Sequence, residues 1–277
     1  MVTFRKLNGF GRAGLGNKLF QYAGVKLYAE LNGFSCAFPK WIGSEIFKGI
    51  EPYSLSQKVR SILLPTIQLD DLPSYDRWQA IQWLLGLKQK LPETFSLKGL
   101  YSNPRDGINI FGYLQDQFAI DLLLNHRHLI RSWLQFNSEI ERIFYEYTKK
   151  FKPWVGVHVR RGDYVKLGLS IPTEKYIKVA EPHIIGRNLF IATNDPTVTK
   201  DFNLLRPINL KNPSLSVPDY VFDFWMLMNS EVIIGGGSTF SWWAAFLGNG
   251  EYHSLPLPQF WAQTKDLEFK RVLFASG

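Results

Sequence analysis

The sequence predicts an α/β protein built on parallel sheets, and the order of its strands and helices carries this prediction. Residues 2–7 read as a short strand, residues 8–16 as a glycine-rich turn, and the chain from Asn17 to Leu31 has apolar side chains at helical spacing. The second half repeats this order. Its expected strands are 154–159, 188–193 and 231–234, and its expected helices lie near 173–183, 219–229 and 239–247. Such alternation is typical of a parallel sheet with crossover helices.

The middle of the chain is less regular. Residues 34–75 are broken by four prolines and predict short elements and loops. We expect a helix from Arg77 to Leu91, a strand over 108–114, and helices beginning near Asp116 and at Ser138, where Ser138-x-x-Glu141 is a capping-box pattern.

The pattern is interrupted at Lys152-Pro153, and the alternation of strands and helices restarts beyond it. We therefore expect two domains, residues 1–150 and 151–277.

Composition indicates a globular protein and limits its class. The 277 residues are 45% hydrophobic and 20% charged, and the single cysteine, Cys36, excludes an intramolecular disulfide framework. No run of about 18 apolar residues appears, and the N-terminus lacks the pattern of a signal peptide. We expect a soluble, cytoplasmic protein that associates with membranes at most peripherally.

The formal charge of +8 comes from 32 Lys+Arg against 24 Asp+Glu, scattered along the chain without a run of five or more basic residues. This distribution disfavours a nucleic-acid partner and suits a small anionic substrate. The 9 Trp, 12 Tyr and 21 Phe predict either an aromatic core or stacking platforms for sugars.

Three turns after predicted strands carry unusual residues, at the edge where open parallel sheets bind ligands. In the first turn, Gly14 and Gly16 allow close approach to a ligand, although the spacing with Gly11 does not match a dinucleotide fingerprint. Asn17 is then either a helix cap or a ligand contact.

The second turn follows the strand 154–159 and runs His158-Val-Arg160-Arg161-Gly-Asp163-Tyr164. Two guanidinium forks suit phosphate oxygens, and Asp163 could hold one of them in place. A surface salt bridge is the alternative.

The third turn joins the strand 231–234 to a helix and contains Gly235, Gly236 and Gly237. Backbone N–H groups and the hydroxyls of Ser238, Thr239 and Ser241 could cradle a phosphate, although alone they could equally form an N-cap. With the arginine pair, they predict a diphosphate site.

Several chemistries lack their motifs. There is no Asp-x-Asp for a metal-bound nucleotide diphosphate, no Walker A loop and no Gly-x-Ser-x-Gly elbow. The five histidines (126, 128, 158, 183 and 253) show no His-Glu-x-x-His pattern. The sequence thus predicts no metal site and no covalent acyl transfer.

These turns resemble the α-1,2-fucosyltransferases of glycosyltransferase family eleven. The matching segments are Gly14-Leu-Gly16-Asn17, the 158–164 turn, and Ser238-Thr239-Phe240-Ser241-Trp242-Trp243. Three further matches are Gly112-Tyr-Leu-Gln115, Ala192-Thr-Asn194-Asp195 and the position of Asp223, fifteen residues before Ser238. Lys18 and Gly237 depart from the Gln and Asn of the family pattern.

The resemblance implies a two-domain, GT-B-like enzyme with a Rossmann-like, parallel-sheet C-terminal half. It would transfer L-fucose from GDP-β-L-fucose to the 2-hydroxyl of a galactose-type acceptor, with inversion and without metal or other cofactor. The donor would lie mainly on residues 151–277 and the glycan acceptor against 1–150. The implied donor-binding residues are Gly14, Gly16, His158, Arg160, Arg161, Asn194, Asp195, Asp223, Ser238, Thr239, Phe240 and Ser241.

Among these residues, Arg160 would stabilise the charge on the leaving diphosphate, and Asp223 would read guanine. The candidate catalytic residues are Arg160, Asp163 and Asn17. Asn17 would face the donor across the cleft. Asp163 and His158 are the nearest candidates for a general base, which the sequence does not assign. A non-catalytic sugar-binding protein and a basic nucleic-acid binder are the alternatives.

Overall fold

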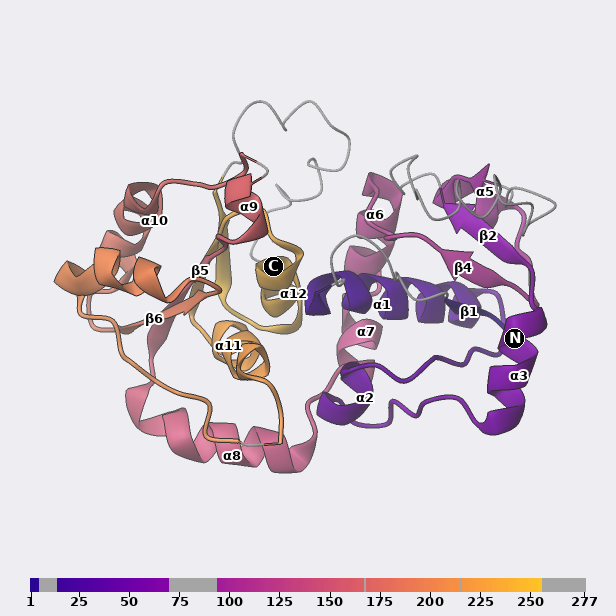
Figure 1. Ribbon diagram of the computed structural model, residues 1–277, viewed down its shortest axis with the longest axis horizontal. Helices are drawn as coiled ribbons and strands as arrows, with labels where there is room; N and C mark the ends of the chain where they lie inside the picture. Colours follow the sequence, from indigo (N-terminus) through magenta and orange to yellow (C-terminus); the bar gives the residue numbers. More distant parts are fainter. Residues whose placement is uncertain (5–13, 70–93, 167, 215, 256–277) are drawn as a thin grey trace. The chain divides into compact units, whose positions relative to one another are not determined.

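The computed structural model describes residues 1–4, 14–69, 94–166, 168–214 and 216–255, which fold as two compact units (Figure 1). The first unit comprises Met1–Ser44 and Gly49–Trp133, and the second comprises Glu45–Lys48 and the chain from Leu134 onward. The division falls at Trp133–Leu134. The sequence suggested a position near residue 150. The expected assignment of donor and acceptor to the two halves stays a prediction.

Residues 134–150 join the second unit because of the packing of helix α8 (Ser138–Thr148). Its buried Phe144 ring lies 5.1 Å from the ring of Phe222 and 5.7 Å from that of Trp225. The break at Lys152-Pro153 thus lies inside a unit, between α8 and the next strand.

The first unit has a four-stranded sheet in the order β1-β4-β2-β3, with each neighbouring pair parallel. Its strands are β1 (Thr3–Phe4), β2 (Thr66–Leu69), β3 (Thr94–Phe95) and β4 (Asn109–Phe111). Its helices are α1 (Leu15–Leu31), α3 (Leu55–Leu63), α5 (Leu97–Ser102), α6 (Gln117–Asn125) and α7 (Arg127–Trp133), while α2 (Gly43–Ile46) straddles the division.

The second unit has a four-stranded parallel sheet in the order β6-β5-β7-β8. The strands are β5 (Trp154–Val159), β6 (Asn188–Thr193), β7 (Val232–Gly235) and β8 (Glu251–Ser254). The α-helices after α8 are α9 (Asp163–Lys166), α10 (Thr173–Ala180), α11 (Asp219–Met228) and α12 (Thr239–Leu247). The 3-10 helices are η1 (Lys149–Phe151), η2 (Glu181–His183) and η3 (Pro196–Leu205).

Helices cover both faces of this second sheet (Figure 1). On one face Val155, Val157 and Ile234 pack with Tyr176 and Ala180 of α10. The alternate residues of β5 point to the other face, where the indole of Trp154 donates to the Met226 carbonyl of α11 at 2.9 Å. This alternation along each strand decides which side chains can meet.

The structure confirms the expected alternation in the second half, where the strands 154–159 and 188–193 have the predicted bounds. The predicted capping box at Ser138 is wrong, because Asn137 is the N-cap and its side chain accepts from the Glu139 N–H. The strand expected over 108–114 is limited to β4. The expected helix 77–91 lies outside the described residues.

Aromatic side chains form much of the core. Every one of the largest fully buried side chains in the described chain is a Trp, Tyr or Phe, which favours the core interpretation of the aromatic content. Among the helices that the structure describes, none is both long and apolar enough to cross a bilayer.

Candidate active site at the carboxyl ends of the strands

The central strand β5 brings two of the predicted turns to one edge of the sheet. It lies between β6 and β7, with Val159 paired to Thr193 and His158 paired to Gly235. The segments that follow the three strands therefore leave the sheet at the same edge, as expected for parallel strands.

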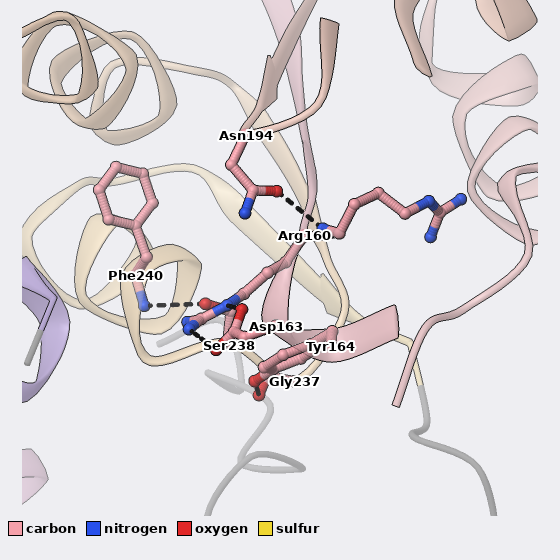
Figure 2. A network of polar contacts seen from close by, with 8 residues as sticks. Arg160, Asp163, Tyr164, Asn194, Gly237, Ser238 and Phe240 are labelled. Atoms are coloured by element: carbon pink, nitrogen blue, oxygen red, sulfur yellow. Dashed lines mark hydrogen bonds and ion pairs between the residues drawn. The ribbon is translucent and has the colours of Figure 1, made fainter. Parts of the chain in front are cut away.

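Arg160 is held in a fixed orientation at this edge (Figure 2). Its Nε and Nη2 donate to the two carboxylate oxygens of Asp163 at 3.1 and 2.7 Å, and its guanidinium lies 4.5 Å from the ring centroid of Tyr164. Burial would raise the pKa of Asp163, but the hydrogen bond and charge of Arg160 outweigh it and leave this pKa below its usual range. The carboxylate is thus ionised at neutral pH.

Tyr164 connects this arginine to the glycine turn. Its hydroxyl donates to the Gly237 carbonyl at 3.2 Å (Figure 2). The turn itself requires glycine, because a Cβ at Gly235 would lie 2.4 Å from the Ser241 hydroxyl and Gly237 has a φ of +59°. The structure therefore brings together the Arg160 and Gly237 segments, which lie more than 70 residues apart in the chain.

The hydroxyls of the glycine turn are largely used within the fold. Ser238 is the N-cap of α12, and its Oγ accepts from the Phe240 N–H at 3.3 Å. Ser241 is fully buried and donates to the Ser238 carbonyl at 3.2 Å. Thr239 is buried as the first residue of the helix. The N-cap interpretation is therefore confirmed, and it leaves the helix N-terminus as the feature that could attract an anion.

Arg161 has a different environment from Arg160. Its Nη1 donates to the Ser170 hydroxyl at 2.8 Å and to the Ile171 carbonyl at 2.6 Å, and its Nη2 donates to the Thr173 hydroxyl at 2.7 Å. Three of its five N–H donors are thereby used in holding the chain that leads into α10. Within the described residues, the guanidinium makes no further hydrogen bond, so two donors could reach a ligand.

Asn194 and Asp195 have structural contacts at the end of β6. Asn194 Oδ1 accepts from the Arg161 backbone N–H at 2.8 Å (Figure 2), and Asp195 caps η3 by accepting from the backbone and hydroxyl of Thr197. The hydrogen bonds from Thr197 lower the pKa of Asp195. Their predicted contacts with the donor stay predictions.

His158 is neutral and closely packed. It is 8% exposed, its ring centroid lies 5.0 Å from that of Phe240, and burial, with the Arg160 charge as a smaller cause, lowers its pKa to about 3. Its Nδ1 is buried and makes no hydrogen bond within the described residues. Since an unpaired buried polar atom is costly, a ligand atom is a natural partner for it.

Asp223 lies on α11, whose Phe224 ring packs edge-on against Phe240 at 5.2 Å. Burial, and secondarily the charge of Asp219, raises the pKa of Asp223 from an ordinary 3.8 to about 7. This carboxyl makes no hydrogen bond or ion pair in the part of the chain that the structure describes. Its side chain is partly buried rather than fully exposed.

In the first unit, Asn17 lies inside α1 rather than at its start. Gly14 is the N-cap, so the cap interpretation of Asn17 is wrong. Asn17 Oδ1 accepts from Gln115 Nε2 at 3.0 Å, and one turn later Gln21 Nε2 donates to the Gly112 carbonyl at 3.1 Å. Two segments that the sequence singled out separately, 14–17 and 112–115, are thus joined.

The fold and this site together define a class of ligand-binding α/β protein. An α/β unit with an arginine fixed beside a glycine turn and a helix N-terminus is suited to an anionic ligand at the carboxyl ends of its strands. The family model described as glycosyl transferase family 11 matches residues 11–263, and the chain belongs to this family.

Individual relatives agree with this result. Among curated proteins the chain is similar to the O-antigen biosynthesis glycosyltransferase WbnK of Escherichia coli, with 23% identity over 90% of this chain and 92% of that protein. Among solved structures it is similar to the fucosyltransferase NodZ from Bradyrhizobium (TM-score 0.55, 16% identity, 90% and 92% covered). A structure of POFUT1 in complex with GDP-fucose gives a TM-score of 0.55 at 12% identity, with 92% and 97% covered.

At these identities the structures establish the fold alone. The expected α/β, GT-B-like fold with parallel sheets is confirmed by them and by the two sheets described above. Membership of the family makes the chain a glycosyltransferase.

Proposed function

We propose that this glycosyltransferase moves L-fucose from GDP-β-L-fucose to the 2-hydroxyl of a galactose-type acceptor, with inversion and without a metal. The motifs of the 158–164 and 238–243 turns support fucose, as do the similar fucosyltransferase structures determined with GDP-fucose. The choice of the 2-hydroxyl rests on the resemblance in sequence, because one of the similar structures is an α-1,6-fucosyltransferase.

The observation that carries the proposal is the fixed guanidinium of Arg160 beside the glycine turn. When the bond between the sugar and the diphosphate breaks, negative charge grows on the departing phosphate while the sugar becomes oxocarbenium-like. A guanidinium already oriented by Asp163 and Tyr164 stabilises that charge without first having to reorganise. The N-terminus of α12 adds a partial positive charge.

In this account Asp163 is a positioning residue. Its lowered pKa and its salt bridge to Arg160 make it a weak proton acceptor, and the pKa of about 3 makes His158 equally unsuitable as a general base. We propose instead that His158 Nδ1, which makes no hydrogen bond within the described residues, contacts the donor.

Asp223 is the proposed reader of guanine. Its ionised carboxylate could accept hydrogen bonds from guanine N1–H and N2–H₂, whereas adenine has an acceptor at N1 and uracil offers one N–H. A half-buried carboxyl without a partner in the described chain supports this role, since such a group otherwise lowers stability.

The acceptor hydroxyl is tested with matched sugars. With GDP-fucose as donor, we expect transfer to a β-galactoside and to its 6-deoxy analogue but not to its 2-deoxy analogue. Transfer to the 2-deoxy sugar at the rate seen for galactoside would overturn the 2-hydroxyl assignment. The 6-deoxy sugar separates this outcome from the α-1,6 linkage that one similar structure makes.

Metal independence gives a second prediction. Because Arg160 and the α12 N-terminus can neutralise the diphosphate, excess EDTA should leave most of the transfer rate. The assay compares EDTA with added Mg²⁺ or Mn²⁺. Activity that is lost in EDTA and restored by either ion would contradict the prediction. His183 and His253 lie in a second group of potential metal ligands. The same assay on a His183→Gln/His253→Gln variant excludes an indirect effect of EDTA through that group.

Asn17 is proposed to position the donor or the attacking hydroxyl, and Gln115 supplies its control. Asn17→Ala and Gln115→Ala remove the same hydrogen bond, so each should lower the free energy of unfolding by about 1 kcal/mol. If Asn17 also contacts substrate, Asn17→Ala should lower kcat/KM at least about tenfold more than Gln115→Ala does. Equal activities at equal stability would reduce Asn17 to a structural role.

A further inference from the structure

Three metal-ligating side chains meet on the second unit, and the site above uses none of them. They are His183, which ends η2, and Glu251 and His253 of the edge strand β8. Their potential ligand atoms all lie within 4.8 Å of one another. We propose that they bind a divalent transition-metal cation of the Zn²⁺ type.

The fold explains why residues about 70 positions apart come together. Glu251 pairs with Val232 and His253 with Ile234, so both side chains continue the sheet face that packs against α10. His183 follows directly after α10 through η2. The apolar layer between helix and sheet thus ends, at the edge strand, in two imidazoles and a carboxylate.

The geometry exceeds what a surface ion pair requires. His253 Nε2 lies 2.9 Å from Glu251 Oε1, and the imidazole of His183 lies 4.7 Å from that of His253, centroid to centroid. A simple ion pair has no need of the second imidazole. His253 Nε2 is also buried. Its contact with Glu251 lacks hydrogen-bond geometry, so this nitrogen has no hydrogen-bond partner within the described residues.

One cationic side chain, Arg187, contacts the backbone that carries His183. It is paired with Glu231 at 2.7 Å, and its Nη1 donates to the His183 carbonyl at 3.1 Å. Its charge is thereby compensated, and its second contact fixes the backbone that carries His183.

The ligand set selects the class of ion. Two imidazole nitrogens and one carboxylate oxygen suit Zn²⁺ and similar first-row ions, whereas Mg²⁺ and Ca²⁺ prefer oxygen ligands only. Three protein ligands leave at least one position for water.

The cluster is distinct from the proposed donor site. His158 and Phe240 pack on the opposite face of the sheet from Glu251 and His253, whose β7 partners Val232 and Ile234 face α10. The ion would join η2 to the edge strand, so this proposal does not depend on the transferase reaction.

The test uses untagged protein, with Zn²⁺ titrated by calorimetry and Co²⁺ by its visible absorption. We expect one ion per chain, a rise in Tm with Zn²⁺, and affinity lowered at least about tenfold in His183→Gln and in His253→Gln. His128→Gln is the matched control, because His128 is an exposed histidine on α7 outside the cluster.

Zn²⁺ binding that is absent, or that is unchanged in both variants, would overturn the proposal. Circular dichroism and the Tm without metal verify that the variants are folded. If one of them does not fold, Glu251→Gln replaces it, since Glu251 is mostly exposed and its loss should leave the core intact.

Discussion

Replacing Arg160 by alanine should lower kcat by about 10²–10³-fold, the cost of removing one donor that stabilises transition-state charge. Arg160→Lys should also be strongly impaired. An ammonium group cannot make the two parallel bonds to Asp163 that fix the guanidinium, nor offer a diphosphate the N–H groups of Nη1 and Nη2 that those bonds leave over. The measurement is kcat and kcat/KM for transfer from GDP-fucose.

Arg142→Lys is the matched control, because Arg142 is an exposed arginine on α8. It should keep wild-type kinetics. A folded Arg160→Lys variant with near-normal kcat/KM would refute the bidentate role of Arg160, and with it the proposed source of charge stabilisation.

The affinity for GDP-fucose should rise about tenfold between pH 6 and pH 8. With a pKa of about 7, Asp223 is roughly one-tenth ionised at pH 6 and nine-tenths ionised at pH 8, and only the ionised form accepts both guanine bonds. The intact sugar nucleotide is the right probe, because its diphosphate has no terminal phosphate that titrates in this range. Calorimetry at several pH values measures the effect.

Two variants make this test specific. Asp223→Asn should weaken binding at pH 8 by roughly 1.5–3 kcal/mol, or one to two decades, and remove the pH dependence. Asp219→Asn removes the charge that helps to raise the Asp223 pKa, so it should move the pH midpoint downward while keeping the affinity at pH 8. An Asp223→Asn variant that prefers GDP over ADP and UDP by the wild-type margin would contradict base reading. Lost kcat with unchanged affinity would indicate proton transfer instead.

The same carboxyl should lower the stability of the chain. Its pKa is higher in the folded state than in the unfolded state, so the free energy of unfolding falls as the pH rises from about 4 to 7 and is lowest above that. Asp223→Asn should therefore raise the free energy of unfolding at pH 8, by about 1–2 kcal/mol after allowance for partial exposure. Gaining stability while losing affinity would mark Asp223 as a functional residue.

The sequence predicted most of the second unit because its strands are apolar runs between clear helices. β5 and β6 have the expected bounds, whereas β8 was missed because Glu-Tyr-His-Ser has no apolar alternation that reveals an edge strand. The division between the units was placed too late because the packing of Phe144 against α11 is a long-range contact.

The candidate site divides in the same way. The turn of Arg160 and the glycine turn were found from local motifs, but the different environments of Arg160 and Arg161 depend on partners such as Tyr164 and Thr173 that no spacing predicts. The cluster of His183, Glu251 and His253 was missed because it, too, depends on residues that only the fold brings together. Glu251-x-His253 places two ligands on one face of a strand, which is a weak signal without the third.

If the carboxyl ends of β5 and β7 bind the diphosphate of a guanine nucleotide, the wild-type chain should prefer GDP to other nucleotides. Calorimetric titration with GDP, ADP and UDP, in EDTA at pH 8, measures this preference. We expect one GDP site, at least about tenfold tighter than for ADP or UDP, that is weakened in Arg160→Ala. Absence of GDP binding, or equal affinity for the three nucleotides, would contradict it.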